Sequence, residues 1–157
     1  MEAKIVTKKE LKLIGKKVVA PVSNLGKEVP QAQNIVRTSE IPFRIEPKGI
    51  MGIGSVRDIV EDTEIHTIYI GSEVSHITEV PKGFEELTIP EQKYVSYTYM
   101  GPMVDCWKVY GELFNWIEKS GYQINLDSYS IEHYDENHNW DDKHTHDNHL
   151  HIYIPIQ

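Results

Sequence analysis

The sequence is poor in cysteine and contains no long apolar run. Its single cysteine, Cys106, cannot form an internal disulfide bond, which fits a reducing compartment. No stretch approaches the roughly 20 apolar residues that a membrane-spanning helix needs. Residues 1–12 begin with charged side chains but have no apolar core or small-residue cleavage site, so they do not resemble a secretory signal. These absences predict a cytoplasmic protein.

Arginine is also scarce, and the formal net charge is −8. A surface that binds duplex nucleic acid needs clustered lysine and arginine to displace counterions. The lysines near the N-terminus are mixed with Glu2 and Glu10, and no helix-turn-helix pattern is present. We therefore expect no direct binding to nucleic acid.

A nucleotide-binding loop is missing as well. Gly49, Gly52 and Gly54 are closely spaced, but their order does not match GxGxxG and a charged segment follows them. Such glycines are more typical of a strand that has a bulge or that another backbone approaches closely. The sequence therefore predicts no cofactor.

One pattern of elements is present twice. About residues 12–73 and again about residues 92–157, the chain reads strand, helix, strand, strand, and a connector of about residues 79–91 lies between them. The first pass has strands at 16–21, 49–55 and 66–73 and a helix that starts near Pro30 and ends at Ile41-Pro42. The second pass has strands at 93–101, 129–136 and 149–156 and a helix over 104–119. Two such units facing each other would share a core and leave a cleft, where ligands favour binding.

The helix over 104–119 carries a wide apolar stripe. Trp107, Tyr110, Phe114 and Ile117 recur at helical spacing, and Cys106 lies beside them. We interpret this stripe, Cys106 included, as hydrophobic core rather than as ligand contacts.

The last two strands alternate between aliphatic and polar side chains. Glu132 and Tyr134 share one face of their strand, and His149, His151 and Tyr153 share one face of the next. With the aliphatic side chains packed on the helices, the opposite face would present tyrosines, histidines and a carboxylate to the cleft. We therefore predict that these five side chains lie together.

The second half resembles the GyrI-like small-molecule-binding domain. This is the effector-binding module of AraC-type and MerR-type bacterial transcription regulators, and it also occurs as a stand-alone protein. The resemblance rests on KYVSYTYMGPM, SIEHYDE and IYIPI, on the connector VPKGFEELTIP, and more thinly on Tyr69-Ile70-Gly71. It implies one α+β domain over residues 1–157, built from duplicated strand–helix–strand–strand units. An antiparallel sheet and a ligand cleft on the pseudo-twofold axis are expected.

The resemblance also implies binding residues. In the multidrug-sensing members of the family, tyrosines and a buried carboxylate hold bulky aromatic cations. Glu132 matches the carboxylate, and the aromatic positions match Tyr69, Trp116 and Tyr153, with Tyr134 beside them. The tyrosines also fit a simpler interpretation, because tyrosine is a favoured strand residue. His149 and His151 depart from the acidic residues usual before IYIPI, which favours neutral or weakly anionic ligands.

The histidine-rich segment raises the question of a metal. His144, His146, His149 and His151 lie among aspartates, and imidazole and carboxylate groups suit zinc, nickel or copper. No spacing matches a closed metal site, and residues 137–148 also fit a solvated hairpin loop. We predict no physiological metal, and these four histidines are the ligands to test.

Three functional hypotheses follow. The first is a small-molecule-binding protein that acts as a sensor, a sequestering protein or a regulator through a partner such as a transcription regulator. The second is a hydrolase of strained cyclopropane-type natural products, as some family members are, in which Glu132 would act with Tyr134 or Tyr153. The third, from the family name, is a protein that inhibits DNA gyrase, for which the acidic charge would mimic DNA.

Overall fold

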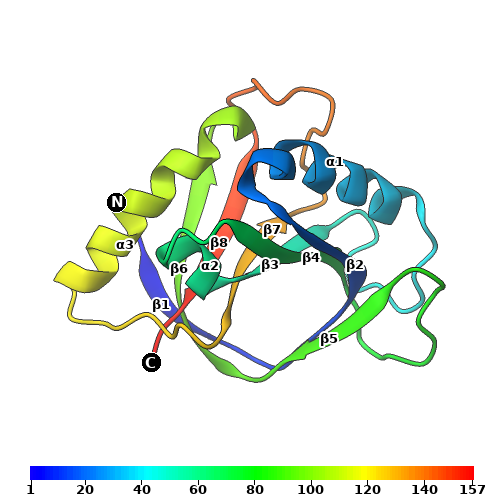
Figure 1. Cartoon of the computed structure of the whole chain (residues 1–157), viewed down its shortest axis with the longest axis horizontal. Coiled ribbons are helices and arrows are strands. Elements are labelled where there is room, and N and C mark those ends of the chain that lie inside the picture. The colour runs from blue at the N-terminus through cyan, green and yellow to red at the C-terminus, as the bar shows by residue number, and fades with distance from the viewer.

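A computed structural model describes residues 1–157 as an α+β fold with one antiparallel sheet of eight strands (Figure 1). The predicted fold class is confirmed. In chain order the elements are β1 (Lys4–Lys8), β2 (Leu11–Pro21), α1 (Val22–Thr38), β3 (Ile50–Ser55), α2 (Val56–Val60), β4 (Ile65–Glu73), β5 (Glu85–Ile89), β6 (Gln92–Met100), the 3-10 helix η1 (Met103–Lys108), α3 (Val109–Lys119), β7 (Tyr129–Tyr134) and β8 (His149–Pro155). None of the helices is both long and apolar enough to cross a membrane.

The strand order is symmetric about the centre of the sheet. The order is β1-β6-β8-β7-β3-β4-β2-β5, so β7 and β3 form the central pair. Each short outer strand pairs with the first long strand of the other half: β1 with β6, and β5 with β2. Because β1 leads directly into β2, and β5 into β6, the two halves are interlocked and the sheet curls (Figure 1).

Both faces of the sheet are covered. On the helix face, α1 packs on one apolar cluster through Ala32 and Val36, and α3 packs on another through Leu113 and Ile117. Figure 1 shows the two helices apart from each other, with α3 over one half of the sheet and α1 over the other. A third cluster lies on the opposite face; it includes Leu13, Ile53, Tyr94 and Ile131. The strands therefore bury side chains in both directions.

The first helix is longer than the sequence predicts. It begins at Val22, so Pro30 lies inside the helix instead of at its first turn. Proline removes one helical hydrogen bond to the carbonyl of Gly26. Both residues are exposed, so water can satisfy that carbonyl, and the packing of Ala32 and Val36 stabilises the helix.

The second helix starts differently from the prediction. Its first six residues form η1, which has three residues per turn rather than 3.6. The changed period turns Trp107 away from the stripe of Leu113 and Ile117, and Trp107 is 67% exposed. Its assignment to the core is therefore wrong. The sequence also did not predict β1, or β5 within the connector.

Candidate functional site

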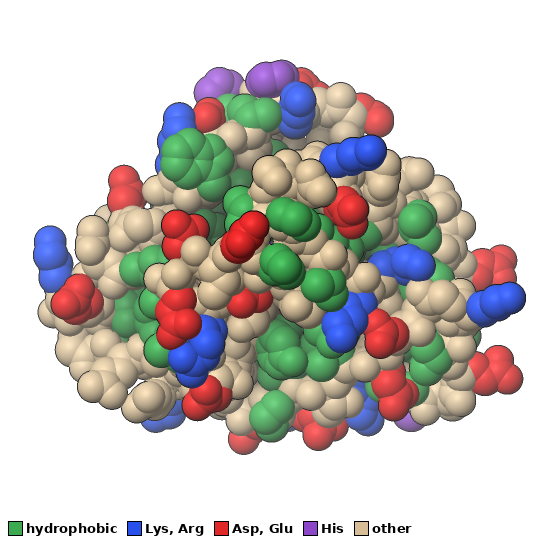
Figure 2. Space-filling model, viewed as in Figure 1, with side chains coloured by type: hydrophobic (Ala, Val, Ile, Leu, Met, Phe, Trp, Pro, Cys, Tyr) green, Lys and Arg blue, Asp and Glu red, His purple; other side chains and the backbone are tan.

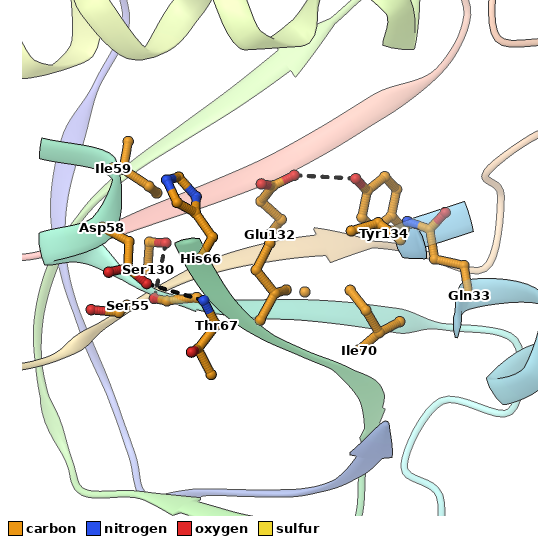
Figure 3. A pocket seen from close by; sticks show the side chains of 14 residues that line it. Gln33, Ser55, Asp58, Ile59, His66, Thr67, Ile70, Ser130, Glu132 and Tyr134 are labelled. Atoms are coloured by element: carbon orange, nitrogen blue, oxygen red, sulfur yellow. Dashed lines mark hydrogen bonds between the residues drawn. The ribbon is translucent and has the colours of Figure 1, made fainter. Parts of the chain in front are cut away.

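A small cavity lies on the helix face, at the centre of the sheet (Figure 3). Its volume is about 130 Å³. Residues of α1, α2 and the strands β3, β4 and β7 line it: Val29, Gln33, Gly52, Gly54, Ser55, Asp58, Ile59, His66, Thr67, Ile68, Ile70, Ser130, Glu132 and Tyr134. Figure 3 shows Glu132 between His66 and Tyr134. We call this the inner cavity.

Glu132 is an acidic side chain at a buried position. The Tyr134 hydroxyl donates a hydrogen bond to its Oε2 across 3.1 Å. The Tyr110 hydroxyl, from α3, is also buried close to Glu132 but has no hydrogen-bond partner. The Glu132 side chain keeps some accessible surface because it lines the cavity, although protein surrounds it. Its carboxylate can therefore accept a further hydrogen bond from a molecule in the cavity.

Glu132 and Cys106 are enclosed by protein, and this burial shifts the pKa of both groups. Burial raises the pKa of Glu132, and the hydrogen bond from the Tyr134 hydroxyl opposes that change only in part. Burial also raises the pKa of Cys106 to about 12, and the nearby Glu132 contributes in the same direction. Cys106 packs against the α3 cluster and is half-buried. An uncompensated carboxylate in such a place favours a cationic or hydrogen-bond-donating partner.

Glycines of β3 leave room for the inner cavity. Gly52 pairs directly with Glu132 across the central strands. A Cβ atom at Gly52 would lie 3.6 Å from Ile70 Cδ1 and 3.8 Å from Glu132 Cβ, which is ordinary contact. Gly52 thus contributes open space to the inner cavity, and its backbone conformation does not require glycine. The sequence interpretation of a close backbone approach fits Gly15 and Gly71 instead, where a Cβ would collide with the paired strand.

Two other polar groups of the inner cavity differ in their availability. Both carboxylate oxygens of Asp58 accept hydrogen bonds, from the Thr63 hydroxyl and the Thr67 N–H. The Nε2 atom of His66 is buried and has no partner. Glu132 and His66 are therefore available to interact with a bound molecule, whereas the Asp58 carboxylate is already engaged.

A second, larger cavity adjoins the first. It measures about 460 Å³, lies between α1, η1 and the chain after β7, and shares Gln33 and Tyr134 with the inner cavity. Three rings form its wall: Trp140 lies 5.2 Å from Tyr134 and 4.5 Å from His138, between ring centroids. We call it the outer cavity.

Residues 135–148, which connect β7 to β8, hold Trp140 in this wall. Asn148 is buried, and its side-chain amide accepts from the Asn139 N–H and donates to the Asn139 carbonyl. Asp135 and Asp142 accept hydrogen bonds from backbone N–H groups two residues later, which forms local turns. The segment rises above the helices in the view of Figure 1, and Figure 2 shows histidines together with basic and acidic side chains on this lobe.

The predicted site residues do not all lie on one face, so that prediction is wrong. Glu132 pairs with Ile152, and Ile131 pairs with Tyr153. Directly paired residues share a face, so Tyr153 lies on the face opposite Glu132. Tyr69 also packs against the cluster on that opposite face. The catalytic group proposed from Glu132, Tyr134 and Tyr153 is therefore not assembled, although Glu132 and Tyr134 are in contact.

The histidines of β8 lie on the opposite face too. His151 Nε2 is 2.9 Å from Asp135 Oδ2, and its Nδ1 is 2.9 Å from Thr98 Oγ1. His149 is exposed, as are His144 and His146. No group of three or more His, Cys, Asp or Glu side chains is arranged to hold a metal ion. Since His149 and His151 do not face the inner cavity, they cannot lower the negative character of its carboxylate by contact.

Trp116 lies on α3, packs against the α3 cluster and lines neither cavity. Sequence reasoning missed three residues that do surround Glu132 and Tyr134: Tyr110, His66 and Trp140. A signal existed for Tyr110, because a tyrosine on an apolar stripe needs a partner for its hydroxyl. No comparable signal pointed to Trp140, which lies in a polar segment.

A buried carboxylate and a wall of aromatic rings, set in adjoining cavities on the helix face of a curled sheet, define a small-molecule-binding domain. Comparison with known families agrees. The model of the GyrI-like small molecule binding domain matches residues 1–157, and the chain belongs to this family. No curated protein matches the chain by sequence.

Solved structures show the same fold at low sequence identity. SAV2435, in a structure bound to tetraphenylphosphonium, is 13% identical, with a TM-score of 0.77 over 100% of this chain and 94% of that one. The EcmrR C-terminal domain is 16% identical, with a TM-score of 0.73 over 99% and 97% of the two chains. A hydrolase encoded by lin2189 from Listeria innocua is 10% identical, with a TM-score of 0.60 over 99% and 92%.

Proposed function

We propose that this domain captures a bulky, largely apolar molecule that carries a cationic or hydrogen-bond-donating group, and that it does so in the two adjoining cavities. The observation that supports this most directly is the Glu132 carboxylate, which is buried, accepts one hydrogen bond from Tyr134 and faces a cavity. A ligand that supplies a positive charge or a donor offsets the cost of burying that carboxylate.

The aromatic wall supports a large ligand with flat or apolar surfaces. Tyr134 and Trp140 offer ring faces, which attract cations by about 0.5–2 kcal/mol each and also bury apolar surface. The inner cavity alone holds only a small group, but the outer cavity is several times larger. We therefore place the polar group of the ligand at Glu132 and its body against Trp140.

We propose that binding serves sensing, sequestration or regulation in the cytoplasm. The likeness to EcmrR, which is also seen in a complex with DNA, supports a regulatory role. In this chain regulation would require a partner protein, such as a transcription regulator, because its own charge does not favour nucleic acid. Binding to DNA gyrase remains a further prediction, and co-purification of the two proteins tests it.

Titration calorimetry with tetraphenylphosphonium tests the proposal. We expect saturable binding, and Glu132→Gln should weaken it about tenfold, which corresponds to about 1.4 kcal/mol. Glu136→Gln is the matched control, because Glu136 is an exposed neighbour that lines neither cavity. An equal loss in both variants, or no binding to the wild-type protein, would contradict the proposed site.

Hydrolysis is a second candidate, favoured by the contact of a carboxylate whose pKa is raised with a tyrosine hydroxyl. Glu132 would direct water and Tyr134 would donate a proton, as general acid–base catalysis requires. Incubation with an electrophilic cyclopropane compound, followed by mass spectrometry, distinguishes turnover from binding. If the compound disappears no faster with the wild-type protein than with the Tyr134→Phe variant, catalysis is excluded for this substrate class.

A further inference from the structure

The two cavities differ in charge. The outer cavity is lined by Gly26, Pro30, Gln33, Arg37, Met103, Val104, Tyr134, His138, Asn139, Trp140 and Lys143. Arg37 and Lys143 are cations, and no aspartate or glutamate is among the lining residues. The inner cavity instead presents the Glu132 carboxylate. In a chain whose net charge is −8, an outer cavity lined by two cations and no carboxylate is unexpected.

Arg37 is placed to receive an anion. It lies in the last turn of α1, and the carbon of its guanidinium group is 4.9 Å from the centroid of the Trp140 ring. The face of the Trp140 ring attracts the guanidinium group through a cation–π contact. Arg37 forms no ion pair with any carboxylate of the chain. A planar guanidinium group binds a carboxylate through two parallel hydrogen bonds.

Lys143 adds a second positive charge to the outer cavity. Its side chain forms no ion pair, and its carbonyl accepts a hydrogen bond from the Val104 N–H, which ties the 135–148 segment to η1. Burial lowers the pKa of His138, the Asp135 carboxylate opposes this change, and Arg37 adds to it. Asp135 is paired with His151 and is not part of the lining, so the outer cavity is lined by two cations and no carboxylate.

We propose that the ligand is amphoteric. Its cationic or donating end lies at Glu132, its aromatic body lies against Tyr134 and Trp140, and a carboxylate at its other end binds Arg37 and Lys143. This inference rests on the proposed function and adds a requirement that a purely cationic ligand does not meet. The cationic group of such a ligand pairs with the Glu132 carboxylate, and its carboxylate pairs with the guanidinium group of Arg37.

A pair of fluorescent dyes isolates the carboxylate. Rhodamine 110 carries a delocalised cation and a free carboxylate, whereas rhodamine 123 is its methyl ester and carries the cation alone. With the wild-type full chain, fluorescence anisotropy should show rhodamine 110 binding about tenfold more tightly than rhodamine 123, as expected for an added bidentate contact with arginine. Equal affinities, or tighter binding of the ester, would overturn the proposal.

Substitutions locate the effect. Arg37→Gln and Lys143→Gln should each weaken binding of rhodamine 110 and leave binding of rhodamine 123 unchanged or stronger. Lys27→Gln makes the same change of charge on α1 outside both cavities and should alter neither affinity. If Arg37→Gln weakens both dyes equally, the carboxylate contact is refuted. If rhodamine 123 and tetraphenylphosphonium bind but rhodamine 110 does not bind better, only this inference fails. If none of the three binds, the proposed function fails with it.

Discussion

The Tyr134 hydroxyl donates a hydrogen bond to the Glu132 carboxylate across 3.1 Å, and the two residues are separated by one position on β7. Alternate residues of a strand share a face, so this contact is local, but the enclosure around it is not. Gln33 of α1 and Tyr110 of α3 approach the pair from different halves of the chain. A carboxylate that neither half could bury alone is buried where the two halves meet.

Removing the charge of Glu132 should stabilise the protein near neutral pH. Its pKa is higher in the folded chain than in the unfolded chain, so the folded state binds the proton more tightly and stability falls as pH rises between those two pKa values. Urea unfolding should show Glu132→Gln about 1 kcal/mol more stable than the wild type at neutral pH, with no gain at about pH 4. Glu136→Gln should behave like the wild type, and a Glu132→Gln variant that is less stable at both pH values would contradict the argument.

The affinity for a cationic ligand should depend on pH through the same group. Protonated Glu132 offers no charge to a cation, so the affinity for tetraphenylphosphonium should rise as pH increases through the raised pKa and then level off. Below that pKa, binding should release a proton, which titration calorimetry detects in buffers of different ionisation enthalpy. The Glu132→Gln variant should bind weakly and independently of pH. A pH dependence retained in that variant would assign the titration to another group.

Filling the inner cavity from β3 should reduce binding without loss of the fold. Gly52→Ala places a methyl group at ordinary contact distance from Ile70 and Glu132 and should keep most of the affinity. Gly52→Val adds volume inside the cavity and should weaken binding about tenfold or more. Valine suits a strand better than glycine does, so thermal unfolding should show no loss of stability. Equal affinities of the two variants would mean that the ligand does not enter the inner cavity.

Cys106 should react slowly with thiol reagents. Burial raises its pKa to about 12, and only the thiolate attacks disulfide reagents. At about pH 8 the thiolate fraction is on the order of 10³ lower than for an ordinary cysteine, so the reaction should be slower by a similar factor. Denatured protein supplies the reference rate for the same thiol. Comparable rates in the folded and denatured states would show that Cys106 is accessible and ionised.

The elements of the fold could be predicted from the sequence because their signals are local. Alternation over residues 129–136 and 149–156 identified β7 and β8 and assigned each residue to one of two faces, which the structure confirms within each strand. The positions of β3, β4 and β6 followed in the same way. The repeated order of elements and the motifs of the second half indicated the family, and the α+β class followed from both.

The face that each strand turns toward the cleft was decided only by pairing between strands. Alternation predicted that the polar residues of β7 and β8 share a face, but the register sets Glu132 beside Ile152 and Tyr153 beside Ile131. Because the sheet has a core on each side, aliphatic side chains fill both faces, and polarity alone could not say which face bears the site. Contacts across long sequence distances likewise brought Tyr110 close to Glu132 and Arg37 close to Trp140.

Local patterns therefore predicted most of the strands, the family and a carboxylate on β7, but neither β1 nor β5. The tertiary structure alone decided which side chains surround that carboxylate. The physical reason is that propensity and periodicity act over a few residues, whereas burial, cavities and charge pairing depend on register and packing between segments far apart in the chain.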